Sequence, residues 1–323
     1  MQNRATIVDD KTMDAECLTF QPLYMERVWG GRKLATLFGR QLPAPSPIGE
    51  SWELVDRADA QSVVSEGRFA GLTLHQLWIQ HRNEIFGEGY EHERFPLLIK
   101  ILDASDAVSV QVHPPIHRAI ELLDEPKTEL WYFVSTDEGA GIFVGLKSGV
   151  TKEKFQSALT DGTVDGLLHR LPTRPGSFMY LPSGRLHAID AGNVLFEVQQ
   201  NSDTTYRVFD WNRVGLDGKP RALHVEQSLE CIDFTDYEPS LGEALEEKLV
   251  SGDTFTVDRW MLDHPRPANT ERKFSIFQVI RGTVSFGGAR EFRFGDLFMV
   301  PANHHRGYLA SKNEIASVLR TTL

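Results

Sequence analysis

The sequence of 323 residues predicts a mainly β protein, with two barrels in tandem and a few added helices. Short apolar runs rich in Val, Ile, Leu and Phe recur between turn residues from Phe95 onward, and a second series of such runs follows an acidic segment (EALEEK) after about residue 235. Runs of this length with β-branched and aromatic residues are typical of strands in barrels or sandwiches. We therefore expect a duplicated barrel.

Composition and charge limit the classes of function. Hydrophobic residues make up 41% and charged residues 24%, as in ordinary globular proteins. The two cysteines, Cys17 and Cys231, form no paired pattern, which indicates a reducing, cytoplasmic setting. The chain shows neither a signal-peptide apolar region nor an apolar run of about 18 residues, so no membrane association is expected. The net charge of -11 argues against nucleic acid as a partner and requires a local Lys and Arg cluster for any anionic substrate.

Three parts are expected along the chain. Residues 1–22 are polar and acidic and form a leader, residues 23–235 form a catalytic barrel domain with helical insertions, and residues 236–323 form a second barrel domain. In the first domain, Thr73 is a plausible N-cap for a helix through Phe86, with Gln76 placed as in a capping box.

The strand series then begins, and two helices interrupt it. One is expected over 116–123, and the other begins at the N-cap residue Thr151. The expected strands of the first barrel are PLLIKIL, AVSVQVH, ELWYFV, GIFVGL, SFMYLP and NVLFEVQQ. Those of the second barrel are TFTVDRWML, FSIFQVI, GTVSFGG, REFRFGDLFMVP and IASVLRTTL.

Three segments of the first barrel carry residues suited to chemistry. Side chains two apart on a strand share a face, so Gln111 and His113 can both point into a barrel, as can Lys127 and Glu129. His187 follows a turn rich in Gly and Pro that can present it inward. An isolated His or Glu is more often structural, but the joint placement on three strand-like segments favours a metal site.

Zinc is the metal that this set of residues suits best. Two neutral imidazoles (His113 and His187) and one carboxylate (Glu129), with the amide oxygen of Gln111 as a possible fourth ligand, leave room for a water or a substrate oxygen on one Zn²⁺ per chain.

The third segment also has a recognisable spacing. Gly176, five residues, Pro182, one residue, Gly184, two residues and His187 match the second motif of cupins, small β-barrels that carry a metal in the mouth. The first cupin motif is matched only loosely, because a helical insertion separates His113 from Glu129.

In the C-terminal half, Gly295 and Pro301 repeat the start of the second motif, but Arg306 takes the place of the histidine. We expect this half to be a degenerate cupin domain without a second metal.

Read together, several segments resemble the type I phosphomannose isomerases in their short bacterial form. The resemblance is dense from about Leu23 to Asp233 and thinner beyond. It rests on the stretches RVWGGRKL (27–34), IGESWEL (48–54), PLLIKILDA (96–104), SVQVHPP (109–115), KTELWY (127–132), GVTKEKF (149–155), LPSGRLHAI (181–189) and EVQQNSDTTYRVFDW (197–211).

The resemblance implies a reaction and a set of roles. The family interconverts mannose 6-phosphate and fructose 6-phosphate through an enediolate. It holds its metal with the residues at His113, Glu129 and His187, and in some members Gln111. Arg207 corresponds to the family's catalytic arginine, and Asp203 and Lys127 match residues implied in substrate handling or proton transfer. For the phosphate we expect Lys100 and Arg207.

Several alternatives remain at this point. The general base could be Asp203, Lys127 or a metal-bound water. Arg207 could instead form a surface ion pair with Asp203 or Asp210, and Lys100 could extend to solvent. A non-enzymatic, metal-stabilised sugar-binding or regulatory cupin is the other class of function considered, and an iron dioxygenase is disfavoured because the close HxH arrangement is lacking. The sequence does not determine the oligomeric state.

Overall fold

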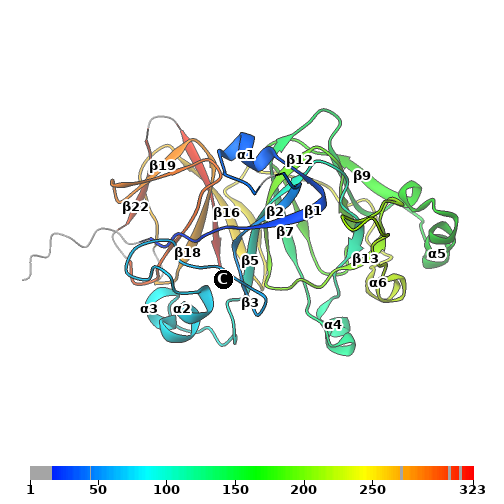
Figure 1. Ribbon diagram of the computed structural model, residues 1–323, viewed down its shortest axis with the longest axis horizontal. Coiled ribbons are helices and arrows are strands. Elements are labelled where there is room, and N and C mark those ends of the chain that lie inside the picture. The colour runs from blue at the N-terminus through cyan, green and yellow to red at the C-terminus, as the bar shows by residue number, and fades with distance from the viewer. Residues whose placement is uncertain (1–16, 44, 270–271, 305–306, 313–314) are drawn as a thin grey trace, which may run out of the picture.

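The computed structural model describes residues 17–43, 45–269, 272–304, 307–312 and 315–323. Two β-rich units lie side by side, the N-terminal one carrying most of the helices (Figure 1). Each unit consists of two antiparallel sheets, so the prediction of a mainly β protein with tandem cupin barrels is confirmed.

The first barrel pairs a seven-stranded sheet with a five-stranded sheet. The seven-stranded sheet contains, in spatial order, β1 (Leu23–Gly31), β2 (Ile48–Leu54), β5 (Leu97–Ala104), β12 (Asn193–Gln200), β7 (Glu129–Thr136), β10 (Ser177–Leu181) and β14 (Gly242–Glu243). The five-stranded sheet contains β13 (Tyr206–Phe209), β6 (Val110–Val112), β11 (His187–Ile189), β8 (Gly141–Leu146) and β9 (Leu168–Pro172). A small hairpin is formed by β3 (Asp56–Arg57) and β4 (Ala60–Gln61).

The second barrel pairs a five-stranded sheet with a four-stranded sheet. The first of these contains β15 (Lys248–Ser251), β16 (Thr256–Leu262), β23 (Ala316–Thr322), β18 (Ser275–Arg281) and β21 (Leu297–Val300). The second contains β17 (Arg266–Pro267), β22 (Tyr308–Ser311), β19 (Thr283–Phe286) and β20 (Arg290–Arg293).

A buried apolar core joins the two barrels. Along β7, Glu129 and Trp131 face the interior of the first barrel, whereas Leu130 belongs to the core shared with Val257 and Ile276 of the second. This alternation is the ordinary period of a strand. The seven-stranded sheet is therefore covered on its outer face by the second barrel, while its inner face is left for the cavity described below.

The helices are short and peripheral. They are α1 (Lys33–Phe38), α2 (Leu74–Gln80), α3 (Arg82–Ile85), α4 (Ile116–Leu122), α5 (Lys152–Asp161), the 3₁₀ helix η1 (Val164–Leu167) and α6 (Val225–Cys231). Helices over 116–123 and from Thr151 are confirmed, whereas α1 and α6 were not expected. In the described part of the chain, no helix has the length and apolar character needed to cross a membrane.

The helix expected to run from Thr73 through Phe86 is instead interrupted. It begins as predicted, with the capping box between Thr73 and Gln76, but His81 has a non-helical φ of -126° and separates α2 from α3. The guanidinium of Arg82 donates to the carbonyl of Trp78 at 3.0 Å. A side chain thus replaces the backbone donor that a continuous helix would supply at this carbonyl.

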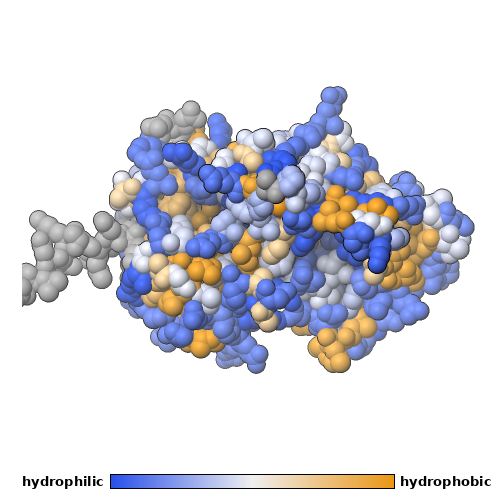
Figure 2. All heavy atoms as spheres, viewed as in Figure 1, coloured by the Kyte–Doolittle hydropathy of each residue, from blue (hydrophilic) through white to orange (hydrophobic). Residues whose placement is uncertain are grey.

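The α4 helix projects from the barrel, and Figure 2 shows apolar side chains gathered on it at the lower edge of the view. Its residues Ile116 and Ile120 are 68% and 71% exposed, and only Ala119 is buried. The helix is the insertion that separates His113 from Glu129 in sequence. It changes the path of the chain without displacing either residue from the barrel interior.

Candidate active site

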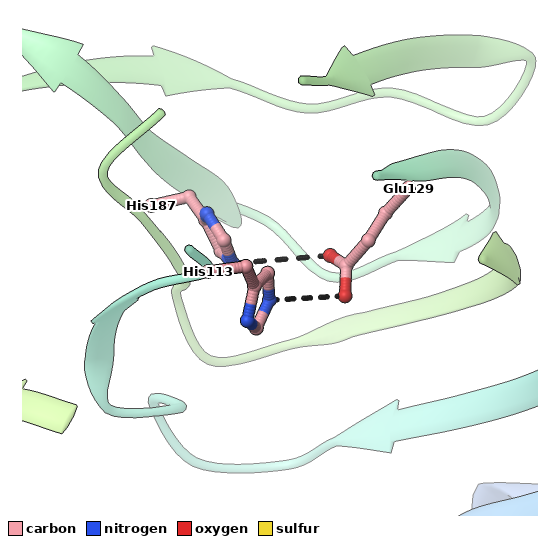
Figure 3. Close-up of side chains that lie close together, drawn as sticks. All are labelled: His113, Glu129 and His187. Carbon is pink, nitrogen blue, oxygen red and sulfur yellow. Dashed lines mark ion pairs between the residues drawn. The ribbon is translucent and has the colours of Figure 1, made fainter. Parts of the chain in front are cut away.

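His113, Glu129 and His187 meet inside the first barrel, and Figure 3 shows both imidazoles directed at the carboxylate. His113 follows β6, Glu129 opens β7 and His187 opens β11. His113 Nε2 lies 3.1 Å from Glu129 Oε1, and His187 Nε2 lies 3.8 Å from Glu129 Oε2. All three side chains are buried.

Backbone carbonyls orient both imidazoles. The Nδ1–H of His113 donates to the carbonyl of Thr204, and that of His187 donates to the carbonyl of Arg185, each at 2.8 Å. These bonds leave both Nε2 lone pairs facing Glu129, which is the tautomer that a metal ligand needs.

The turn before His187 depends on glycine. Gly184 has a φ of +93°, a conformation that other residues adopt only at a cost, and its N–H donates to the carbonyl of His113 at 2.8 Å. The turn therefore connects two of the three segments directly. This is why the spacing from Gly176 to His187 in the sequence predicts that His187 points into the barrel.

The protonation states of His113, His187 and Glu129 favour the binding of a metal cation. Burial, together with the charge of Lys127, lowers the pKa of His113 to about 3, and burial also lowers the pKa of His187. Burial alone would raise the pKa of Glu129, but the positive charge of the neighbouring Lys127 opposes burial, and this pKa lies well below its usual value. The site thus holds two neutral imidazoles and one carboxylate.

The residues present fit zinc. The Nε2 of His113 and both carboxylate oxygens of Glu129 are buried but have no hydrogen bond of good geometry, which is costly unless a ligand occupies the site. The donor atoms of the three residues lie within 4.8 Å of one another. Tetrahedral Zn²⁺ with bonds of about 2.0–2.1 Å needs ligand atoms about 3.3 Å apart, so small adjustments suffice.

Gln111 also lies beside the metal group. Its side-chain amide is 3.3 Å from His187 Nε2, and its backbone is directly paired with that of His187 across β6 and β11. Its role as a fourth ligand remains a prediction.

The carbonyl that orients His113 is itself held by a side-chain clamp. The hydroxyl of Thr204 and that of Tyr206 donate to the two carboxylate oxygens of Asp124 at 2.5 and 2.8 Å. Asp124 directly follows the α4 segment, so the helical insertion is connected through these bonds to a metal ligand.

We expect Asp124→Ala to weaken zinc binding about tenfold. This is the lower end of the loss seen when a residue that helps to orient a metal ligand is removed. Competition with a chromophoric chelator would measure the zinc affinity. Glu121→Gln, an exposed change on the same helix, serves as the control and should leave this affinity unchanged. Equal zinc affinity in Asp124→Ala and the parent would show that the clamp does not act on His113.

A cavity of about 570 Å³ lies next to the metal group. Gln111 and Lys127, which contact His187 and Glu129, are in its wall. This volume is in the range of small-molecule sites. Of the other predicted residues, Lys100, Asp203 and Arg207 also line the cavity, so every one of the eight sequence-predicted site residues lies in the metal group or in this wall.

Lys100 lies in a row across the inner face of the seven-stranded sheet. Register pairs Lys100 with Trp52 on one side and Glu197 on the other, and Glu197 pairs next with Trp131. Lys100 Nζ is 3.2 Å from Glu197 Oε2, and Trp131 Nε1 donates to Glu197 Oε1 at 2.8 Å. Lys100 is thus buried rather than extended to solvent, and the carboxylates of Glu197 and Glu50 outweigh burial and raise its pKa.

Lys127 and Asp203 occupy different depths of the cavity. Lys127 is buried with its Nζ 3.1 Å from Glu129 Oε1, as expected for two residues that share a strand face. Asp203 is exposed at the rim.

Arg207 lies on β13, directly opposite Gln111 of β6, so both side chains share the cavity face of the sheet. Its guanidinium donates to the hydroxyl of Ser109 at 3.2 Å and to the carbonyl of Ala222 at 3.0 Å. Neither of the ion pairs considered from the sequence, with Asp203 or Asp210, is present. Asp210 instead pairs with Arg213 and Arg221.

Sequence reasoning missed several residues of the cavity wall: Arg27, Glu50, Trp131, Glu197, Arg221 and His224. A signal was available for Glu197, since it is the lone carboxylate in the apolar run of β12, and a buried charge requires a partner. The others are recognisable only from their tertiary neighbours. Arg306, predicted to replace the histidine in the second barrel, lies outside the described residues.

Comparison with known proteins agrees with this geometry. The family model of the type I phosphomannose isomerase catalytic domain matches residues 17–135. The mannose-6-phosphate isomerase ManA of Bacillus subtilis is 38% identical over 90% of this chain and 94% of its own length. A crystal structure of the mannose 6-phosphate isomerase from Bacillus subtilis has a TM-score of 0.84 at 30% identity and covers 95% of this chain and 99% of its own.

A further solved structure, described as a mannose 6-phosphate isomerase bound with zinc and yttrium, shares the fold with a TM-score of 0.70 at 15% identity, over 95% of this chain and 99% of its own. The tandem barrels and the buried donor set define a metal-binding cupin enzyme. Within that class, the chain belongs to the type I phosphomannose isomerase family.

Proposed function

We propose that the protein is a zinc-dependent aldose–ketose isomerase that interconverts mannose 6-phosphate and fructose 6-phosphate. The observation that carries this proposal is the buried His113, Glu129 and His187 group beside a cavity lined by charged side chains. Membership of the family supplies the substrate, and the relative ManA bears the name of this activity. The charged cluster at Arg207 and Asp203 in the cavity wall argues against a storage or regulatory cupin, which needs no such cluster.

His113, Glu129 and His187 would hold the metal, with Gln111 beside them. Zinc, when bound, supplies a Lewis acid that polarises the substrate carbonyl. Arg207 shares the cavity face with Gln111, so its permanent positive charge can stabilise the negative oxygen that develops as the enediolate forms.

The isomerisation moves a proton between C1 and C2 of the open-chain sugar. Lys127 and Asp203 are the two groups assigned to substrate handling and proton transfer. Lys127 lies deeper, in contact with the ligand Glu129, and Asp203 lies at the exposed rim. The depth of Lys127 favours it for the transfer itself, and the position of Asp203 favours contact with sugar hydroxyls.

The phosphate requires a cation that is not already neutralised. Lys100 is flanked by Glu197 and Glu50, whereas Arg207 has no carboxylate within ion-pair distance among the described residues. Of the two residues expected to bind phosphate, the surroundings therefore favour Arg207. This role is the alternative to stabilising the enediolate, because one guanidinium does not reach both ends of an extended hexose 6-phosphate.

A coupled assay with mannose 6-phosphate tests the function. The protein as purified should be active, exhaustive chelation should reduce turnover at least about 10³-fold, and added zinc should restore it, because a Lewis acid contributes several kcal/mol to the barrier. Absence of turnover in every metal form would refute the assignment.

A sugar phosphate is the proposed partner, and a cytoplasmic location is proposed from the cysteine usage. The domain division at residues 22 and 235 is likewise retained as a proposal.

A further inference from the structure

We propose that His224 binds the phosphate of the substrate, as a neutral hydrogen-bond donor beside Arg207 and Arg221. The sugar part of this inference rests on the proposed function, whereas the binding of a phosphate anion can be tested separately. His224 lies in a loop that follows β13, and it lines the cavity together with both arginines.

A row of paired residues leads from the metal group to His224. His187 is paired with Gln111 across β11 and β6, and Gln111 with Arg207 across β6 and β13. On the far side of β13, the backbone N–H of His224 donates to the carbonyl of Arg207 at 2.7 Å. Neighbouring strands are about 4.8 Å apart, so His224 lies about three such steps from His187.

This layout matches the two ends of the substrate. In a hexose 6-phosphate, the reacting C1 and C2 are at one end of the chain and the anion is at the other. With C1 and C2 beside the metal group, a sugar that extends along the row would carry its phosphate toward Arg207 and His224.

The hydrogen bonds of His224 define its tautomer. The backbone N–H of Arg207 donates to His224 Nδ1 at 3.3 Å. An imidazole nitrogen that accepts a hydrogen bond carries no proton, so the proton is on Nε2. His224 can therefore donate from Nε2 to a phosphate oxygen without becoming charged.

The charges around this end of the cavity favour an anion. Burial lowers the pKa of Arg207, and the neighbouring charges of Arg221 and Arg213 lower it further, with only Asp210 opposing them. Asp210 is engaged by Arg221 in two hydrogen bonds, of 2.7 and 2.5 Å, and also pairs with Arg213.

Asp210 is thus occupied by two guanidinium groups, of which Arg213 also pairs with the exposed Asp106 at 3.4 Å, whereas Arg207 has no carboxylate within ion-pair distance among the described residues. Asp217 also lines this end, but it is exposed, so solvent screens its charge. A phosphate would give the guanidinium of Arg207 an anionic partner and would accept from Arg207 and His224 together.

Two substitutions of His224 distinguish a role as a hydrogen-bond donor through Nε2 from a purely structural role. In His224→Asn, the amide oxygen can replace Nδ1 as the acceptor for Arg207, but the donor at Nε2 is lost. In His224→Gln, the longer side chain places an amide N–H near the position of Nε2. His117→Asn, an exposed change on α4, is the matched control.

The zinc-loaded enzyme would be titrated with inorganic phosphate, and KM and kcat for mannose 6-phosphate would be measured. A titration after chelation would separate phosphate bound at the metal from phosphate bound at His224. We expect His224→Asn to weaken phosphate binding and raise KM about tenfold with little change in kcat, the loss typical of one hydrogen bond to a charged group. His224→Gln should stay within about threefold of the parent.

Other results would overturn the proposal. Unchanged phosphate affinity in His224→Asn would exclude donation from Nε2, and an equal loss of kcat in both variants would indicate a structural role. Phosphate affinity that depends on His224 in a protein without isomerase activity would support the anion site and refute the proposed function instead.

Discussion

Replacing His187 with alanine is expected to remove bound zinc and to lower turnover at least about 10³-fold. His187 is buried, its Nε2 faces Glu129, and Glu129 and His113 alone would leave too few protein ligands for a zinc enzyme. Loss of the Lewis acid costs several kcal/mol of transition-state stabilisation, and each 1.4 kcal/mol is about tenfold in rate. Metal analysis after dialysis and the coupled assay would measure both effects.

His169→Ala, at a partly exposed histidine of β9 in the same barrel, is the control and should keep both zinc and activity. Circular dichroism and thermal unfolding would show whether His187→Ala keeps its fold. A folded His187→Ala protein that still contains one zinc per chain would contradict the ligand assignment.

Replacing Arg207 with alanine should leave the bound zinc in place and still reduce turnover. Arg207 contacts Ser109 and Ala222 rather than a metal ligand, so zinc content should be unchanged. Turnover should fall about 10²–10³-fold, the usual cost of removing one group that stabilises a developing oxyanion. Metal analysis and steady-state kinetics on the same preparation would test this.

Arg207→Lys keeps the charge but loses the planar fork, so it should recover only part of the activity. A loss mainly in kcat would place Arg207 at the developing negative charge. A loss mainly in KM would restrict it to the phosphate, and near-parental activity in Arg207→Ala would show that neither role is correct.

Local signals in the sequence account for much of the site. The spacing from Gly176 to His187 predicts the histidine, since a positive φ at Gly184 and the proline before it define the turn within a few residues. The strand period of two predicts that Lys127 and Glu129 share a face, and their side chains are indeed 3.1 Å apart. His113 and Arg207 needed the family resemblance, because nothing local distinguishes them from other strand residues.

The sequence by itself determined the class of fold, the turn that presents His187 and the shared face of Lys127 and Glu129, because these depend on short-range periodicity and turn chemistry. Only the tertiary structure decided which distant strands lie next to each other. It paired Lys100 with Glu197, brought His224 to Arg207, and covered the outer face of the seven-stranded sheet with the second barrel. These contacts depend on register between strands far apart in the chain, and register follows from the burial of whole sheet faces rather than from any local pattern.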